Sequence, residues 1–228
     1  MTYFENKTIV VIGATGVFGS HVARSLHQQG ADVRLIVRNP RGLDETLGRL
    51  PVAVASISDR GELESAFTEV SLGRPVDGII NCAGVVAFGA FNDLSERVGA
   101  ELMAVNAIGT MNVIRLAGEG VNPDGFLASF TGVAADMAIA GMGAYCASKV
   151  AAKTAMAVAT RELRAKKIKV LDVRAPHSET GLVNRALEGT APKMPLGLEP
   201  QVVVDRVLEA IAHGEKDLPA EAFIVTKA

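Results

Sequence analysis

The sequence predicts an α/β fold in which helices flank a doubly wound sheet of about seven parallel strands. Short runs rich in β-branched residues alternate with helical patterns along the whole chain. Several of these runs, notably residues 9–12 and 78–80, are continuously apolar, as expected of parallel strands that are buried on both faces. The alternation of strand and helix implies right-handed crossovers, which wind the chain outward from the middle of one sheet.

The expected elements follow one another without a break. The strands are expected at the β-branched runs, which are residues 8–12, 32–37, 52–55, 78–82, 126–130, 168–173 and 223–226. Helices are expected between them, at residues 17–29, 60–70, 95–118, 142–166 and 200–213. No proline-, glycine- or serine-rich linker divides the chain, so residues 1–228 are expected to form a single domain.

Composition and charge exclude several classes of function. A formal net charge of -2 without a basic run leaves no footprint for nucleic acid. Two cysteines and four scattered histidines give neither a disulfide framework nor a metal-ligand spacing, so no metal site is expected. Residues 1–7 are polar, unlike a signal peptide, and the longest apolar stretch, residues 78–91, is too short to span a bilayer. We therefore expect a cytoplasmic protein that does not bind membranes.

A glycine-rich turn follows the first expected strand. Glycines let the backbone approach a diphosphate closely, and the first amides of the following helix point at it. An ordinary tight turn is the alternative, but the place after a buried first strand favours a dinucleotide site in a Rossmann-type sheet. The spacing is GxxGxxG, and the residues expected to contact the cofactor are Gly13, Thr15, Gly16, Val17, Phe18 and Gly19.

Arg38 follows the second expected strand, where an acidic residue would hold the ribose 2′-hydroxyl of NAD. An arginine at this place suits the 2′-phosphate of NADP instead. The other interpretation is a solvated residue at a strand end. We favour NADP(H) as the cofactor.

Tyr145 and Lys149 lie one turn apart near the start of a long expected helix, so both side chains share one face. The reference pKa of tyrosine, about 10, is too high for ready proton exchange at neutral pH. A nearby ammonium favours the phenolate and lowers that pKa, which makes the tyrosine a general acid or base. A surface pair without function is the alternative.

Together these residues resemble the short-chain dehydrogenase/reductase family over nearly the whole chain. The resemblance implies that Asn81, Ala83 and Gly84 lie beside the adenine ribose and that Ser56 and Ile57 lie near the adenine. It implies that Asn106 kinks its helix and holds a water beside the lysine. It also implies that Tyr145 and Lys149 contact the cofactor, together with two residues after the sixth strand, Pro176 and Thr180.

The sequence departs from the family pattern in three places. The commonest family turn is TGxxxGxG, and the usual glycine after the proline is His177 here, which either projects toward the nicotinamide or shapes the loop. The catalytic serine is expected thirteen residues before the tyrosine, where this chain has Gly132. Thr131 is adjacent and either takes the role of the missing hydroxyl or is only a strand-end residue.

The resemblance implies an NADP(H)-dependent oxidoreductase that interconverts a carbonyl and a hydroxyl on a small molecule. Because of Gly132, an NADP(H)-binding regulatory or sensor protein with little activity is the alternative. A dehydratase or epimerase of sugar nucleotides is a weaker third possibility. Residues 177–197 are expected to form a substrate lid whose apolar residues either cover a ligand or belong to the core. A homodimer or homotetramer is expected, assembled through the helices at 95–118 and 142–166.

Overall fold

The computed structural model describes residues 2–223, in which one parallel sheet has the strand order β3-β2-β1-β4-β5-β6-β7. Its strands are β1 (Thr8–Ile12), β2 (Asp32–Val37), β3 (Val52–Val54), β4 (Val76–Asn81), β5 (Val121–Phe130), β6 (Lys169–Val173) and β7 (Asp217–Leu218). The order reverses between β1 and β4, so the sheet is doubly wound as predicted. This reversal opens a crevice at the carboxyl ends of these two strands.

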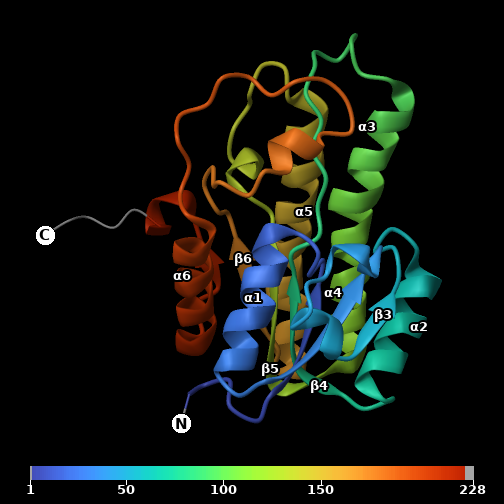
Figure 1. The fold of residues 1–228 in the computed structure, drawn as a ribbon, viewed down its shortest axis with the longest axis vertical. Coiled ribbons are helices and arrows are strands. Elements are labelled where there is room, and N and C mark those ends of the chain that lie inside the picture. Colours follow the sequence, from blue (N-terminus) through green and yellow to red (C-terminus); the bar gives the residue numbers. More distant parts are fainter. Residues whose placement is uncertain (1, 224–228) are drawn as a thin grey trace, which may run out of the picture.

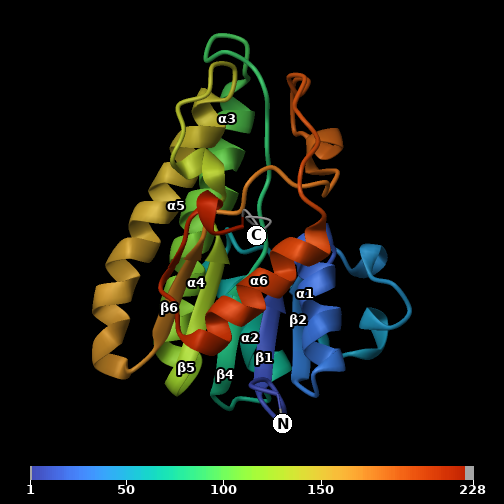
Figure 2. The ribbon, with the colours of Figure 1, turned by 90° about the vertical axis from the view of Figure 1, so that its left-hand side faces the viewer.

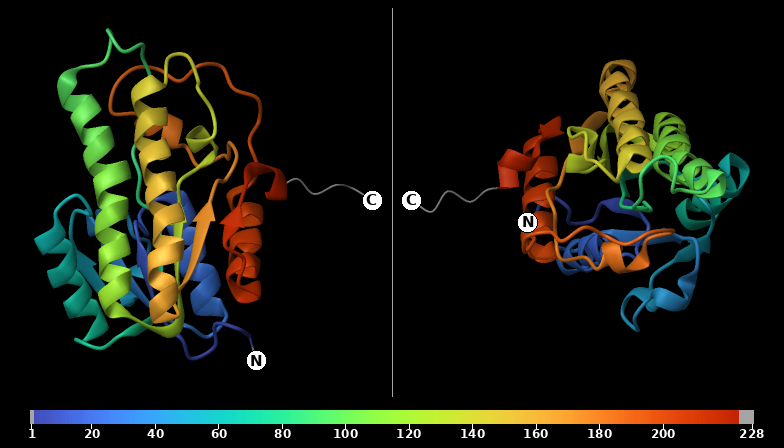
Figure 3. Two further views of the ribbon diagram at one scale, coloured as in Figure 1. Left: turned by 180° about the vertical axis from the view of Figure 1, so that it is seen from behind. Right: turned by 90° about the horizontal axis from the view of Figure 1, so that it is seen from above.

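Helices cover both faces of the sheet. They are α1 (Val17–Gln28), α2 (Arg60–Ser71), α3 (Glu96–Leu102), α4 (Gly109–Gly120), α5 (Gly143–Glu162) and α6 (Pro200–His213). Leu26 of α1 and Val207 of α6 share one apolar core with the sheet, and Figure 2 shows these two helices together on one face. Val113 of α4 and Met156 of α5 belong to the core on the other face, with α4 and α5 side by side in Figure 3. No described helix combines the length and apolar character needed to cross a membrane.

Two of the expected elements differ most from the sequence prediction. The helix expected at residues 95–118 is α3 and α4 joined by a π-helical turn at Met103–Ile108, which contains Asn106. The seventh strand expected at 223–226 is wrong for Phe223, which ends a 3₁₀ turn, Ala220–Phe223, while residues 224–226 lie outside the described part. The edge strand beyond β6 is the two-residue β7, which is too short to give a periodic pattern.

All strands are parallel, so the loops that follow them meet at one edge of the sheet. Above this edge Figure 1 shows the segments 83–94, 131–142 and 177–199, which come from three separate βα connections. The motifs at residues 13–19, 81–84 and 176–180 are therefore brought together by topology, although they are far apart in the sequence.

Candidate active site

The glycine turn packs tightly against the loop after β4. Gly13 has φ +85°, and a Cβ there would lie 2.8 Å from the amide nitrogen of Ala83. A Cβ at Gly19 would lie 2.3 Å from the carbonyl oxygen of Gly13. Contacts this short exclude any side chain at both positions. Gly19 therefore serves helix packing and brings the start of α1 to the crevice.

The N-terminus of α1 fits an anionic group. Its N-cap is Gly16, and no described side chain caps the helix. The first amides of an α-helix have no partner within the helix, and together with the helix dipole they favour phosphate. A diphosphate at Gly16 would meet this requirement, so the residues present fit a dinucleotide.

Two cavities lie along this edge. The smaller, about 170 Å³, collects predicted cofactor residues from four separate loops. These are Gly13, Thr15, Gly16, Arg38, Ser56, Ile57, Ala83 and Gly84. Gly19 and Asn81 line neither cavity. The larger cavity, about 380 Å³, collects the remaining predicted cofactor residues. These are Val17, Phe18, Tyr145, Lys149, Pro176 and Thr180, with Gly16, Ala83 and Gly84 shared between the two cavities.

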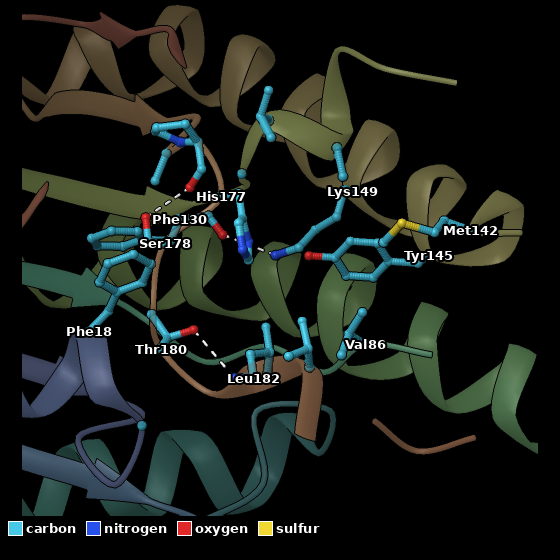
Figure 4. A pocket seen from close by; sticks show the side chains of 18 of the residues that line it. Phe18, Val86, Phe130, Met142, Tyr145, Lys149, His177, Ser178, Thr180 and Leu182 are labelled. Carbon is cyan, nitrogen blue, oxygen red and sulfur yellow. Dashed lines mark hydrogen bonds between the residues drawn. The ribbon is translucent and has the colours of Figure 1, made fainter. Parts of the chain in front are cut away.

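Tyr145 and Lys149 form one wall of the larger cavity. Figure 4 shows the Tyr145 hydroxyl turned toward the amine of Lys149, whose Nζ lies 5.9 Å from the tyrosine ring centroid. The same Nζ donates a hydrogen bond of 3.1 Å to the carbonyl oxygen of Phe130 at the end of β5. Lys149 is buried, so its amine is held at a fixed place beside the phenol.

Burial dominates the protonation of this pair. It raises the pKa of Tyr145 to about 12 and lowers the pKa of Lys149 to about 8, while the negative charge of Asp172 acts against the fall for the lysine. We expected the ammonium to lower the pKa of the tyrosine. In this structure the loss of hydration on burial, with a smaller contribution from the Cys146 thiol, raises this pKa instead, so Tyr145 is a protonated phenol at neutral pH.

Asn106 acts behind the cavity wall. Its Oδ1 accepts from the Val85 amide at 3.0 Å, and its Nδ2 donates to the Val85 carbonyl at 2.9 Å and to Ser148 Oγ at 3.0 Å. The π turn presents this side chain, which joins the loop after β4 to α5. Gly84 lies against the junction, because a Cβ there would be 3.3 Å from Asn106 Oδ1 and 3.4 Å from Lys149 Nζ.

Thr131 is not brought to the cavity. It is buried, and its hydroxyl donates to Asp172 Oδ1 at 2.5 Å. Gly132 lines the larger cavity instead, with φ +81° and ψ 158°, and a Cβ built there would meet nothing within 4 Å. Of the two interpretations of Thr131, the structure supports the strand-end residue.

Asn81 also lies behind the wall. Its Nδ2 donates to Ser129 Oγ at 3.1 Å and its Oδ1 accepts from the amide of Ala83 at 3.1 Å. Asn81 therefore orders the loop that presents Ala83 and Gly84, rather than lining either cavity itself.

The segment expected as a lid contributes part of the larger cavity. Leu182, Val183 and Met194 line it, as does His177, whose Nε2 lies 3.7 Å from Glu179 Oε1. The segment is anchored by its backbone, because the amide of residue 187 donates to the Val86 carbonyl at 2.8 Å. Sequence reasoning missed two groups of lining residues. Those from loops and short turns, which have no periodicity, are Cys82, Val85, Val86, Phe88, Val133, Ala134, Met137, Ile139, Met142, Ser178 and Arg185. Those in or beside regular elements are Ile12, Ile36, Ala55, Val105, Phe130 and Ala175.

Comparisons with known proteins agree with this architecture. The family model described as short chain dehydrogenase matches residues 7–190. Dehydrogenase/reductase SDR family member 7B of Rattus norvegicus is 24% identical over 249 residues, covering 99% of this chain and 77% of that protein. The 2-(S)-hydroxypropyl-CoM dehydrogenase 3 of Xanthobacter autotrophicus is 29% identical over 161 residues, covering 64% and 61%. A short chain dehydrogenase from Burkholderia cenocepacia J2315, solved with NADP, has a TM-score of 0.82 at 22% identity, covering 96% of this chain and 90% of that one.

The backbone at Gly132 predicts that a serine will not be tolerated there. Its φ and ψ lie in a region that is essentially confined to glycine, and other residues cost about 1–3 kcal/mol. Gly132→Ser and Gly132→Ala should therefore both lower the free energy of unfolding by about that amount, measured by urea titration. Gly48→Ala is the control, because a Cβ there meets nothing within 4 Å and Gly48 has no positive φ. A Gly132→Ser variant as stable as the parent would contradict the prediction.

The buried charge of Lys149, which the proposed chemistry needs, is expected to lower the stability of the fold. Its folded pKa of about 8 lies below the ordinary 10.5, so the cost of the buried charge is present below pH 8 and is relieved as the pH rises toward 10.5. Lys149→Met should raise the free energy of unfolding at pH 7 by about 2 kcal/mol, after allowing for the lost bond to Phe130. It should also remove the rise in stability that the parent shows between pH 8 and 10.

Urea titrations at pH 7 and pH 9.5 measure both effects. Lys216→Met, at an exposed lysine, is the matched control and should change neither value. A less stable Lys149→Met variant at pH 7 would mean that the amine stabilises the fold.

Proposed function

We propose that this chain, which belongs to the short-chain dehydrogenase family, is an NADP(H)-dependent oxidoreductase that interconverts a carbonyl and a hydroxyl group on a small molecule. One observation carries the proposal: the Tyr145 and Lys149 pair forms a wall of a cavity that shares Gly16, Ala83 and Gly84 with the cavity of the glycine turn. A reacting group beside the phenol would thus lie next to one end of a dinucleotide.

Each residue of the site has a proposed role. A bound nicotinamide supplies or accepts the hydride. Tyr145, protonated at neutral pH, gives its proton to the carbonyl oxygen of the substrate. Lys149, held on the Phe130 carbonyl, fixes the phenol and offers its amine to the cofactor ribose. Asn106 positions the lysine by joining the loop after β4 to α5 through Val85 and Ser148.

The preference for NADP(H) rests on Arg38. It lines the smaller cavity with an exposed side chain, and the nearest carboxylate, that of Glu101, is 3.9 Å away. No aspartate or glutamate lines either cavity within residues 2–223. A guanidinium at the adenosine end, with its nearest carboxylate 3.9 Å away, suits a 2′-phosphate.

The substrate is proposed to be apolar around its reactive group. The wall beyond Tyr145 consists of apolar side chains: Val86, Phe88, Met137, Ile139 and Met142 from the loops, and Leu182, Val183 and Met194 from residues 177–197. This segment is the proposed lid, because it supplies that wall. Ligand pockets of this size and apolar lining commonly take small organic molecules.

A regulatory or sensor protein remains the second candidate, and Gly132 is the observation that favours it. The missing hydroxyl would have helped to polarise the substrate carbonyl, and loss of one such donor costs on the order of 10²–10³ in rate. The Thr131 hydroxyl offers no replacement, since it is bonded to Asp172 and Thr131 does not line the cavity.

A single domain that assembles into a homodimer or homotetramer completes the proposal. Exposed apolar side chains support it, with Met103, Ile108 and Met111 near the π turn and Val150 and Val158 on α5. Burial of such side chains between copies would remove apolar surface from water. Gel filtration should give two or four times the chain mass of 23.8 kDa, and elution as a monomer would contradict the assembly.

Replacement of the phenol tests the enzyme. NADPH oxidation is followed across ketones, aldehydes, diketones and β-ketoacyl thioesters, and Tyr145→Phe should lower kcat on the order of 10²–10⁴ while NADPH binding is kept. Tyr3→Phe is the matched control, since the chain has two tyrosines and Tyr3 lines neither cavity.

Two results would contradict parts of the proposal. If the parent protein binds NADPH but does not oxidise it with any compound of the panel, the sensor is the better interpretation. Faster oxidation of NADH than of NADPH would contradict the role given to Arg38.

A further inference from the structure

One residue of the lid lines both cavities. The residues common to the two are Gly16, Cys82, Ala83, Gly84 and Arg185. The first four belong to the two loops at the edge of the sheet, after β1 and β4. Arg185 ends the short 3₁₀ turn Leu182–Arg185 within the lid, a different part of the chain. The junction of the cavities is therefore bounded by backbone of the sheet edge and by one arginine from the lid.

The charge of Arg185 is not neutralised by the protein. Within residues 2–223 its guanidinium donates only to carbonyls just before its own turn, from Nε to Gly181 at 3.4 Å and from Nη2 to Thr180 at 3.2 Å. Among residues 2–223 no carboxylate lies within 4.0 Å of it. A guanidinium has five N–H donors, so most of them remain for a ligand.

The other groups at the junction also favour an anion. Gly16 is the uncapped N-terminus of α1, where helix amides and dipole attract negative charge. The cavities are lined by Arg38, Lys149 and Arg185 without any described carboxylate. A dinucleotide with its adenosine in the smaller cavity and its nicotinamide in the larger places its diphosphate, which is its central anion, at this junction.

We infer that Arg185, which lies in the lid, binds the diphosphate of the dinucleotide. The first amides of α1 would bind the same diphosphate from the side of the sheet. The inference rests on the proposed function, because it requires a dinucleotide across both cavities. The planar guanidinium suits two phosphate oxygens at once. Since the same turn carries Leu182 and Val183 on the wall of the larger cavity, this contact also fixes the substrate wall over the bound cofactor.

Ligand binding tests the inference without reference to turnover. Parent, Arg185→Ala, Arg185→Lys and the control Lys193→Ala are titrated calorimetrically with NADPH, NADH and adenosine 2′-monophosphate. Lys193 is an exposed lid cation that lines neither cavity. Arg185→Ala should bind NADPH about ten- to thirtyfold more weakly, with Arg185→Lys in between. Adenosine 2′-monophosphate, which has no diphosphate, should bind all four proteins equally, and Lys193→Ala should match the parent.

Three outcomes would overturn the inference. Unchanged NADPH affinity in Arg185→Ala would show that the arginine serves another ligand or none. An equal loss for adenosine 2′-monophosphate would place the effect at the adenosine end or in the fold. If the parent binds neither dinucleotide, the proposed function fails together with this inference, whereas the first two outcomes leave the proposed function standing.

Discussion

The close approach of the turn after β1 to the loop after β4 is the constraint on which the site depends. The amide of Cys82 donates to the Ile12 carbonyl at 2.9 Å, and Gly13 touches Ala83 so closely that no Cβ fits between them. This contact sets the start of α1 and the place of Gly84 at once. The hydrogen bonds from Asn106 to Val85 and Ser148 then fix the position of α5, and with it Lys149, relative to this contact.

A second, charged network explains why the cavity lacks a hydroxyl at the end of β5. Arg174 is buried and directly follows β6. It pairs with Asp136, Asp172 and Asp217 at N–O distances of 2.5, 2.8 and 2.5 Å. Asp172 is thereby fixed as an acceptor, and the Thr131 hydroxyl turns inward to it. A buried carboxylate without these partners would cost several kcal/mol, so the network outweighs any pull on Thr131 from the cavity.

Sequence reasoning reached the parts of this molecule that repeat a pattern. The buried strands and the order of loops at the sheet edge followed from apolar runs and glycine spacing, because these reflect backbone requirements. It failed where contacts between distant parts of the chain determine how a side chain is oriented or protonated. The direction of the Thr131 hydroxyl depends on Asp172, forty-one residues away. The pKa of Tyr145 depends on how deeply the cavity buries it, and Arg185 joins two cavities only through the path of the lid.

The protonation of the site bears on the direction of the proposed reaction. A phenol with a pKa of about 12 stays protonated at neutral pH, which suits donation of a proton to a carbonyl oxygen. Taking a proton from an alcohol would first require the phenolate, which burial disfavours. With glycine at position 132, the wall formed by Tyr145, Lys149 and Gly132 offers the hydroxyl of Tyr145 and no second hydroxyl. Both features suit the role proposed for Tyr145, which is to donate a proton to a carbonyl oxygen.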